Sequence, residues 1–164
     1  LYQRFRGPLY RYLLRQCGER GLAEELFQDI WMRVIRARQR YQPQALFKTY
    51  LFHLAHNVLI DHYRHRARGL PVSYEQDQAE IIDAHPGAAQ HQPEHQAASR
   101  EQLERFRALI SELPEAQREA FLLHEEGGLT IEEIARVTDV KREAAKSRLR
   151  YAIQRLRSGL RDLL

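Results

Sequence analysis

Hydrophobic residues recur every three or four positions through most of the chain, which is the spacing of one face of an α-helix. Between residues 22 and 38, for example, Ala23, Phe27, Ile30 and Val34 form one such stripe. On either side of residues 69–99 we find no strand signal. The pattern predicts an all-α protein whose first three helices cover about residues 2–16, 22–38 and 46–66, the first interrupted near Gly7 and Pro8.

The helical periodicity stops between residues 69 and 99. This segment holds three of the six prolines, several Gln and His residues and little repeating pattern, which is typical of a flexible linker. The sequence therefore predicts two small helical domains, residues 1–68 and residues 100–164, joined by the linker 69–99.

The C-terminal domain begins with an expected helix over residues 100–113. Pro114 suits the first turn of a second helix, and Gly127 and Gly128 are expected to end it.

The sequence "TIEE", residues 130–133, has the spacing of a capping box, in which Thr130 and Glu133 satisfy each other's backbone amides. It predicts a short helix over residues 131–137. A tight break at Asp139 and a long basic helix from Lys141 follow. A short helix, a tight turn and a longer helix form the helix-turn-helix layout.

Charge reverses sharply along the chain, although the net charge is only +4. Residues 1–68 hold 13 Arg and Lys against 5 Asp and Glu, and residues 136–164 hold 9 against 3. Between them, residues 69–99 hold five acids and no Arg or Lys, and residues 100–135 hold 9 acids against 4 cations. Two basic blocks separated by acidic sequence predict two contacts with a polyanion.

The beginning of the last helix carries candidate DNA contacts. Ala145, Leu149 and Leu156 form its expected buried stripe. The other face carries Glu143, Lys146, Ser147 and Arg150. In a helix-turn-helix this end enters the major groove, where Lys and Arg donate to guanine or phosphate. The alternative is a solvated cationic face. The coincidence of capping box, turn and charge reversal favours DNA binding.

Other kinds of site find little support. Cys17 is the only cysteine, so neither a disulfide within the chain nor a cysteine-based zinc site is possible, and a reducing cytoplasm is expected. Three pairs of histidines have short spacings but no third ligand in view, so no metal site is expected. We also expect no cofactor, no catalytic residues and no membrane insertion, because no nucleophile–base set, phosphate loop or long apolar run is present.

Three quoted stretches resemble one protein family. "LPEAQREAFLLHEEGGLTIEEIARVTDVKREAAKSRLRYAIQRLR" resembles the domain that binds the promoter −35 element in extracytoplasmic-function (ECF) sigma factors, a branch of the bacterial sigma-70 family. "AEELFQDIWMRVIRARQRY" and "FKTYLFHLAHNVLIDHYRHRAR" are similar to that family's domain for core RNA polymerase and the −10 element. The resemblance implies a promoter-specificity subunit that performs no chemistry. Its implied partners are core RNA polymerase, through the β′ clamp helices and the β subunit, promoter DNA and an anti-sigma factor.

The resemblance also implies three sets of site residues. Contacts with the β′ clamp helices fall on Glu25, Gln28, Asp29 and Met32. Contacts with the opened −10 strand fall on Phe47, Lys48, Tyr50, His53, Asn57, Asp61 and Arg64. Contacts with the −35 element fall on Arg142, Glu143, Lys146, Ser147, Arg148, Arg150 and Tyr151.

Some positions depart from the family's pattern, and one alternative function stays open. Tyr50 stands where Trp is common, and Asp139 stands where the turn usually has Gly, a left-handed conformation that Asp tolerates. Phe47 is as well suited to the core as to base stacking.

The competing interpretation is a stand-alone helix-turn-helix regulator that binds duplex DNA without polymerase.

Overall fold

The computed structural model describes residues 2–38, 46–69 and 93–162, and for residues 93–99 the backbone alone. Most of the predicted linker, residues 70–92, lies outside the described residues, and so do residues 39–45 between the second and third predicted helices. Within the described ranges the chain forms seven α-helices and no strand, which confirms the all-α prediction. They are α1 (Tyr2–Cys17), α2 (Arg20–Ala37), α3 (Phe47–Ala67), α4 (Pro93–Glu112), α5 (Glu115–Glu125), α6 (Ile131–Thr138) and α7 (Arg142–Arg161).

Helices α1, α2 and α3 pack together around a shared core. Its fully buried side chains include Leu9, Leu13, Leu26, Ile30 and Leu51. These residues lie three or four positions apart within each helix, so each helix turns one stripe inward.

The expected interruption of the first helix is wrong, because α1 continues through Pro8. A proline inside a helix removes one backbone hydrogen bond and costs roughly 3 kcal/mol. Here Leu9, Tyr12 and Leu13 are fully buried directly after it. The burial of these side chains offsets the local cost.

Helices α5, α6 and α7 form the second core, with α4 packed along α7. Leu122, Leu123, Ile134, Ala145 and Ala152 are buried in its interior. The small residues of α7 allow the close approach of its neighbours. At the other end of α7, a side chain at Gly159 would collide with Leu109 of α4.

Helix α4 begins at Pro93, so the prediction of a helix that starts at Arg100 was wrong by seven residues. Proline is well tolerated at the first helical position, where its missing amide hydrogen has no partner to lose. The boundary that the sequence suggested between residues 99 and 100 therefore falls inside a helix.

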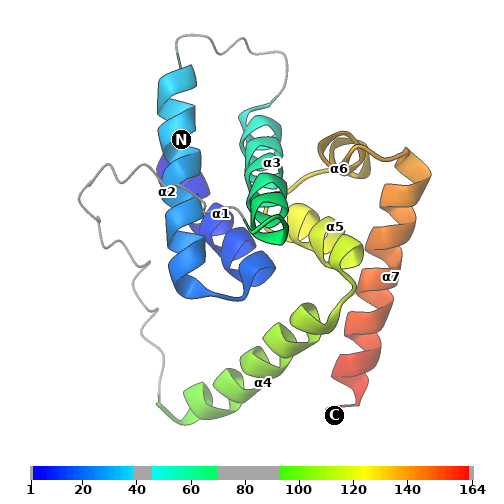
Figure 1. Ribbon diagram of the computed structural model, residues 1–164. Helices are drawn as coiled ribbons and strands as arrows, with labels where there is room; N and C mark the ends of the chain where they lie inside the picture. Colours follow the sequence, from blue (N-terminus) through cyan, green and yellow to red (C-terminus); the bar gives the residue numbers. More distant parts are fainter. Residues whose placement is uncertain (1, 39–45, 70–92, 163–164) are drawn as a thin grey trace.

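The two groups of helices lie against each other in the structure (Figure 1). Helix α3 contacts α6, and α1 contacts both α4 and α5. As a result α3 is buried on two sides: Leu51 and Val58 are buried, and so are Phe52, Ala55 and Leu59.

Candidate nucleic-acid interface

Helices α6 and α7 form the helix-turn-helix that the sequence predicts. The Thr130 hydroxyl accepts a hydrogen bond from the Glu133 amide at 3.2 Å, and the Glu133 carboxylate accepts from the Thr130 amide at 3.1 Å. The predicted capping box is thus present. Asp139 ends α6 in the left-handed conformation (φ 54°, ψ 52°), and Lys141 is the N-cap of α7. This turn sets the direction in which α7 leaves α6.

Most of the predicted −35 residues lie on the side of α7 that is turned away from its buried stripe of Ala145, Leu149, Ala152 and Leu156. Five of them are exposed: Arg142, Glu143, Lys146, Arg150 and Tyr151. Ser147 and Arg148 are half-buried. The cation of Arg150 lies 5.2 Å from the centre of the Tyr151 ring.

Arg142 is held by two carboxylates on the surface. It donates to Glu132 of α6 at 2.8 Å and to Glu143 at 3.3 Å. The hydrogen bond from Arg142 lowers the pKa of Glu132, and the same bond raises the pKa of Arg142. The ion pair joins the first turn of α7 to α6.

The predicted −10 residues divide into an exposed row and a half-buried cluster. His53, Asn57, Asp61 and Arg64 are exposed and follow one another along α3 at three- or four-residue spacing. At the beginning of α3, the Phe47 ring lies 5.3 Å from that of Phe5 and 6.2 Å from that of Tyr50. Phe47, Lys48 and Tyr50 are all half-buried. Phe47 therefore packs against the core from the edge of this row.

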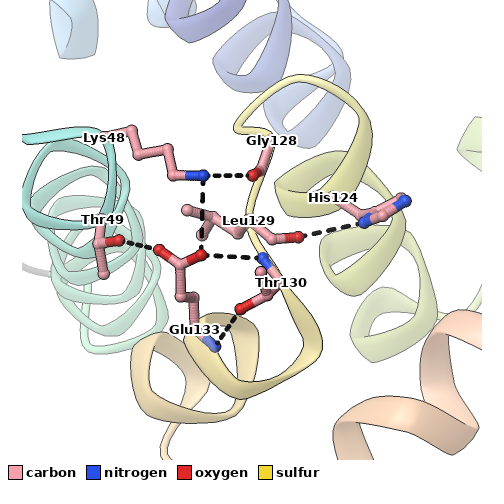
Figure 2. Close-up of polar contacts among 7 residues, drawn as sticks. All are labelled: Lys48, Thr49, His124, Gly128, Leu129, Thr130 and Glu133. Carbon is pink, nitrogen blue, oxygen red and sulfur yellow. Dashed lines mark hydrogen bonds and ion pairs between the residues drawn. The ribbon is translucent and has the colours of Figure 1, made fainter. Parts of the chain in front are cut away.

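Lys48 is in contact with the helix-turn-helix. Its ammonium group donates to the carbonyl oxygen of Gly128 at 2.7 Å and lies 3.7 Å from the Glu133 carboxylate (Figure 2). A predicted −10 contact and the capping box of α6 are thus neighbours in this structure.

The predicted polymerase-binding residues lie on α2. Glu25 and Gln28 are exposed, while Asp29 and Met32 are half-buried. Asp29 accepts a hydrogen bond from Arg33, one turn further along the helix, at 3.2 Å.

Comparison with known proteins identifies the family. Residues 1–69 match the family described as "Sigma-70 region 2", and residues 103–156 match "Sigma-70, region 4". The ECF RNA polymerase sigma factor SigM of Bacillus subtilis is 30% identical over 158 residues, which cover 96% of this chain and 91% of SigM. The chain belongs to the ECF sigma factors of the sigma-70 family.

Another relative agrees with this assignment, and a solved structure shows the same fold. The ECF sigma factor SigE of Mycolicibacterium smegmatis is 32% identical over 156 residues, 93% of this chain and 57% of that relative. The sigma factor RpoE of Bartonella quintana, solved in complex with the anti-sigma factor NepR, has the same fold, with a TM-score of 0.72. It is 22% identical in sequence, and the match covers 98% of this chain and 94% of RpoE.

The family assignment gives the sigma factor its general role. It is an RNA polymerase sigma factor, which directs transcription initiation by binding core polymerase and promoter DNA. The members of this family are non-catalytic initiation factors. The assignment therefore favours the sigma-factor interpretation over a stand-alone regulator.

Three carboxylates of the sigma factor lie between its two groups of helices. The sequence interpretation missed their contacts there, although it had assigned Glu133 to the capping box. Glu119 of α5 accepts a hydrogen bond from the Tyr12 hydroxyl at 3.0 Å, and Glu126, the C-cap of α5, accepts one from Arg15 of α1 at 2.7 Å. Glu133 of α6 accepts a hydrogen bond from the Thr49 hydroxyl (Figure 2). The acidic composition of residues 100–135 was a signal for them, although it does not indicate which acids are buried.

Glu133 stays ionised despite its position. Burial raises the pKa of its carboxyl, but hydrogen bonds from Thr49 and Thr130 lower it by more, so the pKa lies below its ordinary value. A buried carboxylate that accepts several hydrogen bonds keeps its negative charge and is held in one position.

Two further findings concern the described residues alone. They hold no group of three or more His, Cys, Asp and Glu side chains that could bind a metal ion. Nor does any helix among them have the length and apolar character to cross a membrane.

Proposed function

We propose that the exposed side of α7 near its beginning recognises the −35 element. The observation that carries this proposal is the arrangement of α7 itself. Arg142, Glu143, Lys146 and Arg150 are exposed within its first three turns, while Ala145 and Leu149 are buried where α7 packs on α5 and α6. In a helix-turn-helix, this is the part of the second helix that reaches base edges in the major groove.

The second part of the proposal places the opened −10 strand along α3. The row of His53, Asn57, Asp61 and Arg64 offers donors, acceptors and a cation to unstacked bases and to the backbone. The aromatic pair Phe47 and Tyr50 lies at one end of this row. One base stacked on a ring would contribute about 1–3 kcal/mol.

The third part assigns Glu25, Gln28, Asp29 and Met32 of α2 to core polymerase. These residues face away from the contacts of α2 with the core, in which Ala23, Leu26, Ile30 and Trp31 are buried. The β subunit and an anti-sigma factor are further proposed partners, the latter because relatives such as RpoE have been solved with one.

The functional division of the chain is also part of the proposal. Residues 1–68 would bind core polymerase and the −10 strand, residues 69–99 would connect, and residues 100–164 would bind the −35 element. The chain would have no catalytic activity and no cofactor, and it would act in the cytoplasm.

The proposal is tested with holoenzyme reconstituted from core polymerase and the full chain. Its binding to duplexes that differ at single −35 bases is titrated at two salt concentrations. Lys146→Ala and Arg150→Ala should each lose about 1–3 kcal/mol if the residue contacts a base, with weaker discrimination at that base. Arg157→Ala, on the distant part of α7, is the control: it should weaken all duplexes alike or none. If all three variants behave identically, α7 does not recognise the −35 element through this face.

A further inference from the structure

Arg142 differs from the other cations of α7, because acidic side chains hold it in place. Its Nε atom donates to Glu132 of α6 at 2.8 Å, and its Nη1 atom donates to Glu143 at 3.3 Å. Within the ranges that the structure describes, it is the one cation of α7 that pairs with a carboxylate. The bond to Glu132 crosses from α7 to α6, so it joins the two helices of the helix-turn-helix.

The position of Arg142 in its helix explains this pairing. Arg142 is the first residue of α7, directly after the N-cap Lys141. A cation is unfavourable there, because the free amides at the beginning of a helix carry partial positive charge. Helix α6 lies beside this end of α7 (Figure 1), and its Glu132 carboxylate is within reach of the guanidinium. Glu132 and Glu143 therefore offset the positive charge of both the side chain and the helix end.

The charge of this group makes it a poor site for phosphate. One guanidinium and two carboxylates carry a net charge of −1. The hydrogen bond from Arg142 lowers the pKa of Glu132, which is therefore ionised at neutral pH. Lys146 and Arg150, further along the same helix, have no carboxylate partner among the described residues. Attraction for the DNA backbone is thus expected from Lys146 and Arg150 rather than from Arg142.

The guanidinium of Arg142 nevertheless keeps several directional donors. A guanidinium has five N–H groups, and the two hydrogen bonds use one on Nε and one on Nη1, so the remaining three are on the terminal nitrogens. The side chain is 51% exposed, which leaves this outer edge accessible to a ligand. Two parallel N–H groups match the O6 and N7 acceptors of guanine in the major groove.

We propose that Glu132 is a positioning residue for promoter recognition, which holds Arg142 so that its outer edge contacts a guanine of the −35 element. An arginine without such a partner samples many rotamers and can turn to the nearest phosphate. An arginine held at Nε presents its remaining donors in one direction, and the two carboxylates repel phosphate. Glu132 acts through Arg142 and does not contact DNA itself. The inference rests on the proposed function, because it requires that the beginning of α7 binds the −35 element.

The test measures base preference and salt dependence separately. Holoenzyme is reconstituted from core polymerase and the full chain, and its affinity is titrated for duplexes changed at single −35 base pairs, at two salt concentrations. Two variants remove the same charge: Glu132→Ala removes the acceptor, while Glu132→Gln keeps an amide oxygen that can accept from Arg142. Glu112→Ala, at an exposed position of α4, controls for the loss of one acid.

Arg142→Ala should reduce the preference for guanine at one −35 position by about 5- to 150-fold, with little change in the salt slope. Glu132→Ala should lose most of the same preference and bind unrelated duplexes more tightly, because a carboxylate that repels the backbone is gone. Glu132→Gln should gain the same non-specific affinity but keep more of the preference. Glu112→Ala should keep all of it. In a chain that already carries Arg142→Ala, Glu132→Ala should change no base preference further.

Thermal melting followed by circular dichroism should differ little between the parent and both Glu132 variants, since an exposed ion pair contributes little to stability. A loss of base preference is then not an effect of unfolding. The inference is overturned if Lys146→Ala alters the −35 preference while Glu132→Ala preserves it, or if Glu132→Ala acts equally with and without Arg142. A loss of preference at a base other than guanine overturns it as well. A parent holoenzyme that distinguishes no −35 base would instead contradict the proposed function itself.

Discussion

Glu133 offers the sharpest test of how the helix-turn-helix is stabilised, because one carboxylate serves two purposes. It completes the capping box with Thr130 and accepts from Thr49 across the interface with α3 (Figure 2). Glu133→Ala should remove both interactions. Thr130→Ala should remove only the cap, and Thr49→Val only the bond across the interface.

The expected magnitudes follow from these contacts. Loss of an N-cap side chain costs about 1 kcal/mol of the free energy of unfolding. Leaving the buried Thr49 hydroxyl without its acceptor adds about 1–3 kcal/mol, and the half-buried pair with Lys48 adds at most about 1 kcal/mol. We therefore expect Thr130→Ala and Thr49→Val to cost about 1 kcal/mol each and Glu133→Ala about 2–5 kcal/mol.

Urea unfolding followed by circular dichroism measures all three variants and the Glu133→Ala/Thr49→Val pair. The pair should be less destabilised than the sum of its members, because they share one interaction. A cost for Glu133→Ala no larger than that for Thr130→Ala would show that the carboxylate does not bridge the two groups of helices.

The same residue predicts a pH dependence. The pKa of Glu133 in the folded chain is lowered, net of burial, by its hydrogen bonds. Its contribution to stability is therefore fully present above its unfolded pKa of about 4.3 and is lost as the pH falls through the folded pKa. Glu133→Gln should lack this part of the acid destabilisation. An unchanged acid profile would contradict the assignment of an ionised Glu133.

The remaining predictions concern three other places. Burial raises the pKa of Cys17 to about 11, so its thiolate fraction at pH 8 should be roughly 200-fold below that of a thiol of ordinary pKa; its reaction with a disulfide reagent should be slow, and a fast reaction in the folded chain would contradict this. Asn57→Ala should impair promoter opening more than closed-complex binding, and permanganate footprints identical to the parent would exclude the α3 row. Asp29→Arg should weaken binding to core polymerase with little change in the melting temperature, while unchanged affinity would remove this face of α2 from the interface.

Local features of the fold could be predicted from the sequence. The capping box of Thr130 and Glu133 and the turn at Asp139 depend on residues a few positions apart, and both are present. The exposed side of α7 follows equally from its helical spacing. Such features are encoded in short stretches, where propensity and hydrogen bonding act together.

The packing of the two groups of helices could not be predicted in the same way. Glu126 and Arg11 are separated by more than a hundred residues, and no local pattern pairs them. One signal was available in the sequence of α3. Phe52, Ala55 and Leu59 form a second apolar stripe, and a helix that packs on one side only would need a single stripe. The continuity of α1 through Pro8 is also a tertiary effect, since packing there outweighs local preference.

The most direct test of the central claim, that α7 and α3 recognise different promoter elements, is transcription from a promoter library randomised at both elements. Holoenzymes reconstituted with the parent chain, Glu143→Ala, Lys146→Ala or Asn57→Ala each select active promoters. We predict that Glu143→Ala and Lys146→Ala change the preferred −35 bases and leave the −10 preference intact, while Asn57→Ala does the reverse. A change of preference at the other element, or none in any variant, would contradict the account.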